Sequence, residues 1–159
     1  MVTLDSSGFD DLIRELERAN LGNGQLAEAM VEAAADEIRG AWREAVQSHG
    51  LIDTGDMLES IGFPGPIKKI GDVLYQDVYP QGKDRKGVRN AEKAFINHYG
   101  RKNLKPTYFV DDANSRAEPR VAERLNKMWD DYQRDGTIPQ NQVASASEGE
   151  GIRVKNKKK

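Results

Sequence analysis

The segment Leu51–Ile61, LIDTGDMLESI, joins a long helical pattern to a run of short apolar segments separated by turn residues. Gly50 precedes it and is a typical helix-stop residue, because glycine tolerates the left-handed backbone conformation of many helix ends. A turn signal follows, made of Asp53, Thr54 and Gly55. Apolar residues then return at helical spacing at Met57, Leu58 and Ile61. The segment therefore predicts a helix stop, a chain reversal and a short helical turn capped by Thr54 or Asp56.

On physical grounds alone, the same segment also fits an ordinary connection between a helix and a strand, and nothing in it is catalytic by itself. The composition adds a second constraint. The chain has 159 residues, of which 37% are hydrophobic and 31% are charged, so its apolar content is low for a globular protein. This balance fits either a small core with polar tails or a protomer that relies on its neighbours.

Charge and cysteine content exclude several classes of function. A net charge of −2 creates no overall field that attracts nucleic acid or an anionic membrane. The absence of cysteine excludes disulfides and thiolate metal sites, and the two histidines, His49 and His98, would need carboxylate help to hold a metal. We find no run of about 20 apolar residues and no signal-peptide pattern, and so expect a soluble protein of a reducing compartment.

Helical patterns flank a central β region. Ser7 and Asp10 resemble a capping box, and an apolar stripe follows on one helix face, ending near Leu21 and formed by Phe9, Leu12, Ile13 and Leu16. A long alanine-rich helix is expected over Gln25–Ser48, with Trp42 as a core anchor. Gly40 costs such a helix about 1 kcal/mol relative to alanine, for which a tight packing contact is the expected reason.

Strands are expected after the turn, beginning near Ser60–Phe63 and continuing over Ile67–Ile70 and Val73–Tyr79. Ala91–Tyr99 fits a short helix or a strand. The final helix is expected over Val121–Tyr132, with Pro119 either in its first turn or at a kink. We therefore predict an α+β fold in which the long helix and the final helix pack on a small, mostly antiparallel sheet through Ile38, Trp42, Leu125 and Trp129.

The predicted domain covers residues 9–135, with an N-terminal arm over 1–8 and a polar, basic-ended C-terminal arm over 136–159. The C-terminal arm is either a disordered tail or a segment that orders on a partner. Its candidate contacts are Ile138, Val143, Ile152 and Val154. The loop over residues 80–90 carries a second set of candidate contacts, which are Lys83, Arg85, Lys86 and Arg89. A solvated loop explains these charges better than phosphate binding, because no aromatic residues lie between them.

No sequence motif indicates catalysis. The phosphate-binding, dinucleotide-binding, zinc-protease and hydrolase motifs are absent. The acidic pairs Asp53/Asp56 and Asp111/Asp112 are best explained as helix caps. His98 with one of the latter two carboxylates would be an acid–base pair that lacks a nucleophile. We therefore expect no enzymatic activity, no cofactor and no metal.

The order of elements and two short motifs resemble the tail-completion, or head–tail joining, family of tailed bacteriophages, which includes the Z-type minor tail proteins. The first motif, D-T-G-x-L-x-x-S-I, is matched by Asp53, Thr54, Gly55, Leu58, Ser60 and Ile61. The later motifs are matched at Tyr99, Gly100, Phe109 and Ala113. The departures are the missing proline before Asp53, His98 in place of an acidic residue, Arg101 in place of threonine and Tyr108 in place of proline.

The resemblance implies a structural protein of the virion neck, assembled in the host cytoplasm, that works by binding. Such proteins form a ring, usually sixfold, at the head-proximal end of the tail, and they contact tail and connector proteins. Contact with DNA in the lumen, without sequence readout, is a further expectation. A tail terminator, which stops tube growth, is the alternative within this class. A small nucleic-acid-binding module that uses the basic loop and the C-terminal tail is the alternative from another class.

Overall fold

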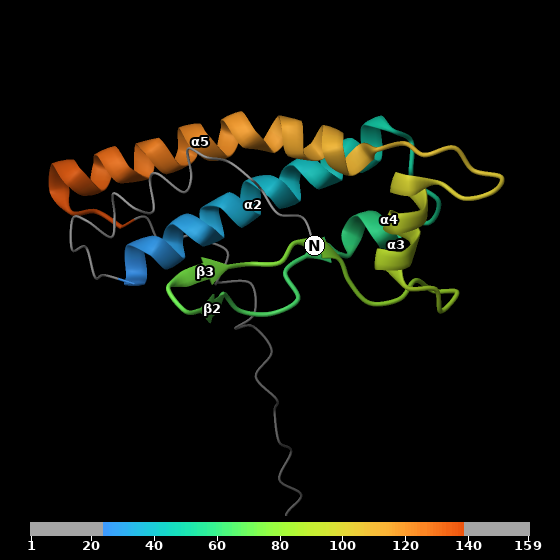
Figure 1. Ribbon diagram of the computed structural model, residues 1–159, viewed down its shortest axis with the longest axis horizontal. Helices are drawn as coiled ribbons and strands as arrows, with labels where there is room; N and C mark the ends of the chain where they lie inside the picture. The colour runs from blue at the N-terminus through green and yellow to red at the C-terminus, as the bar shows by residue number, and fades with distance from the viewer. Residues whose placement is uncertain (1–23, 139–159) are drawn as a thin grey trace, which may run out of the picture.

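The computed structural model describes residues 24–138, in which two long helices lie side by side and the remaining elements gather below and at one end of them (Figure 1). The helices are α2 (Gly24–Ser48), α3 (Asp56–Glu59), α4 (Asn90–Tyr99) and α5 (Phe109–Asp135). The strands are β1 (Ile61–Gly62), β2 (Lys68–Ile70), β3 (Val73–Tyr75) and β4 (Tyr79–Pro80). The arm 1–8, the apolar stripe over 9–16 and the candidate contacts Val143, Ile152 and Val154 lie outside the described residues.

The core lies mainly between α2 and α5, which run antiparallel. Small side chains line their contact, and several have no exposed area: Ala33, Ala41 and Ala45 on α2, and Ala113 and Ala117 on α5. Trp42 fills the end of the interface, where its ring meets that of Phe109 edge-on at 5.8 Å. Alanine faces let two helix backbones approach closely, so the alanine-rich pattern of α2 is explained by this helix pair.

Salt bridges follow the seam between the two helices. Arg124 of α5 reaches Glu37 of α2 at 2.9 Å, and Arg120 reaches Glu44 at 2.8 Å. The hydrogen bond from Arg120 holds the pKa of the Glu44 carboxyl below its usual value. Because these groups are partly exposed, we expect the salt bridges to set the register of α2 against α5 and to add little to the stability of the protein.

The strands form two antiparallel ladders, β1 with β4 and β2 with β3. They confirm the α+β class with a small antiparallel sheet, and α2 contacts both β1 and β3. Gly71 has a φ of 60° in the turn between β2 and β3, where a two-residue hairpin requires positive φ. Strands of two or three residues bury little area, which is why most of the core is helix against helix.

Several predicted boundaries are close to the observed ones, and four details change. The strand expected over Val73–Tyr79 is two short strands, β3 and β4, which belong to different ladders. Residues 90–99 are helical, which settles the helix-or-strand alternative. The final helix begins at Phe109, so Pro119 lies inside it and not in its first turn. Pro119 and Ser115 are both exposed, so the carbonyl that loses its partner faces water and the helix tolerates the proline. Finally, a Cβ at Gly40 would meet nothing within 4 Å, so the expected packing contact is wrong.

Candidate functional site

The predicted turn forms as expected. Helix α2 ends at Ser48, and Gly50 and Gly55 have φ values of 66° and 85°. Thr54 Oγ1 accepts a hydrogen bond from the backbone N–H of Asp56, the first residue of α3, at 3.3 Å. The N-cap position itself is held by Gly55 without a side-chain hydrogen bond, so neither Thr54 nor Asp56 is the expected cap. The Ser60 hydroxyl closes the short helix by donating to the Met57 carbonyl at 2.8 Å.

Basic residues of the 80–90 loop contact this turn, although the sequence placed the two features far apart. Arg85 donates to the Asp56 carboxylate from Nε at 2.9 Å and from its terminal nitrogen at 2.7 Å. The backbone N–H of Arg85 donates to the same carboxylate at 3.1 Å. These bonds hold the pKa of Asp56 far below its usual value. Lys86 lies 3.8 Å from the Asp53 carboxylate.

Asp84 organises the loop from within. Its buried carboxylate accepts hydrogen bonds from the backbone N–H groups of Lys86 at 2.9 Å and Val88 at 2.8 Å. It also forms an ion pair with Lys93 of α4, and the hydrogen bond from Lys93 is the main cause of its lowered pKa. The loop is thus bound to the turn on one side and to α4 on the other. Sequence reasoning missed Asp84, although an acidic residue among basic residues and turn glycines was a usable signal.

The four predicted contact residues therefore differ in role. Arg85 and Lys86 pair with carboxylates of the turn, so part of their charge is already neutralised. Lys83 and Arg89 face each other across an isolated backbone bridge, and neither forms a salt bridge with any carboxylate of residues 24–138. Ile138 is half-buried against the helical core.

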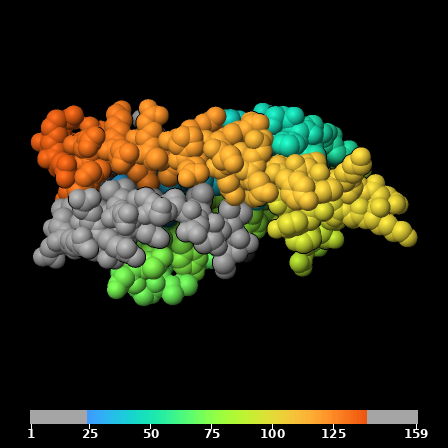
Figure 2. Space-filling view, turned by 45° about the horizontal axis from the view of Figure 1, so that its top comes forward, coloured from blue at the N-terminus to red at the C-terminus, as the bar shows by residue number. Residues whose placement is uncertain are grey.

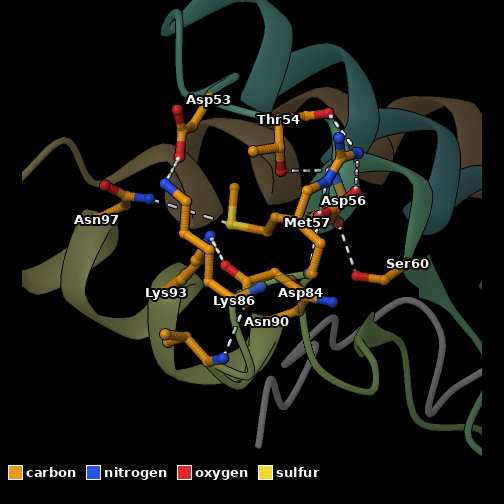
Figure 3. A network of polar contacts seen from close by, with 12 residues as sticks. Asp53, Thr54, Asp56, Met57, Ser60, Asp84, Lys86, Asn90, Lys93 and Asn97 are labelled. Carbon is orange, nitrogen blue, oxygen red and sulfur yellow. Dashed lines mark hydrogen bonds and ion pairs between the residues drawn. The ribbon is translucent and has the colours of Figure 1, made fainter.

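An apolar groove opens beside the turn, between the segment after α2, the 80–90 loop, α4 and the loop that follows α4. Its volume is about 320 Å³. Its apolar lining consists of Leu51, Ile52, Met57, Leu58, Val88, Ile96 and Leu104. Three of these side chains remain well exposed at the rim: Ile52 at 48%, Val88 at 41% and Leu104 at 40%. Asn97 and Lys93 add polar atoms to the wall (Figure 3).

The residues of the later motifs divide between the core and the surface. Phe109 and Ala113 have no exposed area. Gly100 ends α4 with a φ of 77°, and a Cβ there would lie 2.5 Å from the carbonyl oxygen of Leu104. Tyr99, by contrast, is 59% exposed, and its ring packs at a tilt of 53° against that of Phe95 with ring centroids 4.8 Å apart. The turn over residues 100–108 and α4 form a projecting end of the molecule (Figure 2).

His98 and the carboxylates of Asp111 and Asp112, which the sequence offered as an acid–base pair, have a structural role. The side chain of His98 is buried, its Nδ1 accepts a hydrogen bond from the backbone N–H of Val110 at 3.3 Å, and its Nε2 lies 4.0 Å from the Asp111 carboxylate. Asp111 and Asp112 both lie in the first turn of α5, where negative charge is favoured as predicted, while the N-cap residue is Tyr108 and makes no side-chain cap. Within residues 24–138, no cluster of three or more histidine or acidic side chains is arranged to hold a metal ion.

Comparison with family models, curated proteins and solved structures finds no match to this chain. None of the described helices is long and apolar enough to cross a bilayer. The structure brings together the first motif, the basic loop and α4 around one groove. It places Phe109 and Ala113 in the core instead.

Proposed function

We propose that the protein is a structural subunit of the neck of a tailed bacteriophage, where it forms a ring at the head-proximal end of the tail and completes the tail for head joining. Support comes from the motif Asp53–Ile61 and from the order of elements around it. In the structure that motif forms the junction between the long helix and the β region, as the family pattern requires. The proposal concerns a protein that binds and assembles.

Two separate apolar surfaces carry this proposal. One lies at the end formed by α4, where Phe95, Tyr99 and Tyr108 are 63%, 59% and 54% exposed. The other lies at the tip of the β2–β3 hairpin, where the paired residues Ile70 and Val73 are 67% and 61% exposed. Exposed apolar patches of this kind mark protein–protein contacts. Two different patches on one protomer suit a head-to-tail contact between copies, which closes into a ring when the rotation allows it.

The test is a joining assay. Tails that lack this subunit are mixed with heads, with and without the purified protein, and joined particles are counted by electron microscopy. The proposal predicts joined particles only when the protein is present. Equal numbers of joined particles in both samples would reject it.

The tail terminator is the alternative within the same class, and tail length separates the two roles. Tails assembled without a terminator should be too long, because nothing stops the growth of the tube. Tails assembled without a completion protein should have the normal length and should fail to join heads. Measuring tail lengths in the absence of this protein therefore assigns the role.

A nucleic-acid role has one observation in its favour. Arg101, Lys102 and Lys105 are exposed in the turn beside the aromatic residues of α4, and none of them forms a salt bridge with a carboxylate of residues 24–138. Basic side chains next to exposed rings suit single-stranded nucleic acid. If this were the main function, the wild-type protein should bind single-stranded DNA, the variant with all three residues replaced by glutamine should not, and neither protein should restore joining. Normal joining by the triple variant would reject it.

A further inference from the structure

We infer that the groove beside the turn is filled by the N-terminal segment of a second copy of this chain, through the apolar stripe Phe9, Leu12, Ile13 and Leu16. This inference deepens the proposed function and rests on its ring of identical copies. It names which surface of one copy meets which segment of the next. Three observations support it: the character of the groove, the charge around it and the distance that the chain must cover.

The groove has the character of an unfilled contact for an amphipathic segment. Apolar side chains of the turn and of α4 line it, and the half-exposed residues Ile52, Val88 and Leu104 form its rim. A helix that presents apolar residues at three- and four-residue spacing can lay such a stripe into an apolar groove. Residues 9–16 have this spacing, as the sequence analysis established.

The charges of the two surfaces are complementary. Residues 1–23 contain five acidic and two basic side chains. The lining carries Asp53, which lies beside Lys86, and Lys93, which pairs with Asp84. Arg101 on the wall, with the exposed Lys102 and Lys105 in the same turn, adds positive charge that these pairs do not balance. The C-terminal segment ends in KNKKK and would meet these residues with charge of the same sign. Charge complementarity therefore favours the N-terminal segment over the C-terminal one.

The length of the chain favours a second copy over the same copy. The groove lies beside the C-terminal end of α2, since Leu51 and Ile52 line it, whereas residues 1–23 join α2 at Gly24. A helix of 25 residues is about 37 Å long. Leu16 precedes Gly24 by eight residues, which span at most about 28 Å when fully extended. The whole stripe therefore cannot reach the groove of its own chain.

The resulting contact is head-to-tail. Residues 1–23 join the start of α2, and residues 139–159 follow the end of α5. These two helix ends lie on the same side of the molecule, away from α4 (Figure 1). The groove lies on the α4 side. A segment leaving one end of each copy and binding the other end of its neighbour repeats the same contact around a ring.

Disulfide trapping tests the inference in the full-length protein, which has no native cysteine. The variants Ile13→Cys and Leu104→Cys are purified separately, mixed and oxidised, and the linked peptides are identified by mass spectrometry. A disulfide requires Cα atoms within about 7 Å, so random collisions give little product. Arg14→Cys, on the polar side of the stripe, replaces Ile13→Cys in one control, and Asn126→Cys, exposed on α5, replaces Leu104→Cys in another.

The inference predicts several-fold more of the Ile13–Leu104 link between copies than of either control link. A yield equal to the controls would overturn it. So would a link that forms only within one chain of the Ile13→Cys/Leu104→Cys double variant, or a link to Leu104→Cys from Val143→Cys instead. A link within one chain would assign the groove to the N-terminal segment of the same chain, and a link from Val143→Cys would assign it to the C-terminal segment.

A second variant separates this inference from the proposed function. Leu104→Asp places a charge at the exposed rim and should weaken association between copies about tenfold or more. Asn126→Asp makes the same change of charge on α5 and should have no effect. A Leu104→Asp protein with the wild-type mass in solution and normal joining would overturn the inference. The same result would not contradict the proposed ring. Failure of the wild-type protein in the joining assay would instead remove the proposed function, while trapping still reports on contact between copies.

Discussion

Replacing Gly100 with alanine should destabilise the protein strongly, because this residue ends α4 at a position that only glycine fits. Its φ of 77° and ψ of −177° lie in a region populated almost entirely by glycine, where another residue costs about 1–3 kcal/mol. The new Cβ would also lie 2.5 Å from the Leu104 carbonyl oxygen and 2.8 Å from the Pro106 nitrogen. Both neighbours are backbone atoms, so the turn over residues 101–106 must move.

That movement breaks local hydrogen bonds. Arg101 and Leu104 exchange two backbone hydrogen bonds of 2.9 Å, each of which contributes about 1 kcal/mol. Together with the backbone strain, the expected loss of unfolding free energy is about 3 kcal/mol. For a chain of this length, such a loss lowers the midpoint of thermal unfolding by about 6–12 °C. Circular dichroism during heating measures this midpoint.

Gly87 provides the matched control. Its φ of 82° is close to that of Gly100, yet a Cβ there would meet nothing within 4 Å. Gly87→Ala should therefore cost only the left-handed conformation, about 1 kcal/mol. Equal unfolding midpoints for the two variants would refute the argument that backbone contact makes Gly100 irreplaceable.

Three further predictions concern stability. Ala113→Leu should lower the free energy of unfolding in urea by about 1–3 kcal/mol, because Ala113 is fully buried between the helices. Ala91→Leu, at an exposed site, should lower it little, and similar losses for the two variants would contradict the packing described. Gly40→Ala should stabilise α2 by about 1 kcal/mol, since the new Cβ meets no atom, and a lower urea midpoint would disprove this. The carboxyl pKa values of Asp56 and Asp84 are lower in the folded protein than the ordinary value of 3.8. These groups therefore contribute their full stabilisation of the fold above pH 3.8 and lose it as the pH falls through the folded-state pKa values. The urea midpoint should thus fall in acid, less steeply for Asp84→Asn, and an identical acid slope for the variant would exclude a role for Asp84.

The sequence predicted well those features that are encoded by neighbouring residues. Gly50, Thr54 and Gly55 act on the backbone within a few positions, so the helix stop, the turn and the short helix were predictable from type and spacing, although the cap by Thr54 or Asp56 was wrong. The alanine-rich pattern likewise predicted α2 to within one residue of its observed start. The buried role of Trp42 followed from the same periodicity and is confirmed.

Features made by distant segments were not predictable in the same way. The contact between Arg85 and Asp56 joins residues far apart in the chain, and no local rule pairs one particular cation with one particular carboxylate. The groove was missed because four separate segments form its walls. The predicted start of the final helix was too late, because Pro119 usually marks a helix boundary. Here the helix continues through Pro119, because the carbonyl that loses its hydrogen bond belongs to the exposed Ser115.

The most direct test of the proposed ring is electron cryomicroscopy of isolated tails that lack this protein, imaged before and after it is added. The account predicts added density at the head-proximal end of each tail, with rotational symmetry and with one 17.8 kDa chain in each repeat. A tail end that is unchanged by addition of the protein would contradict the account.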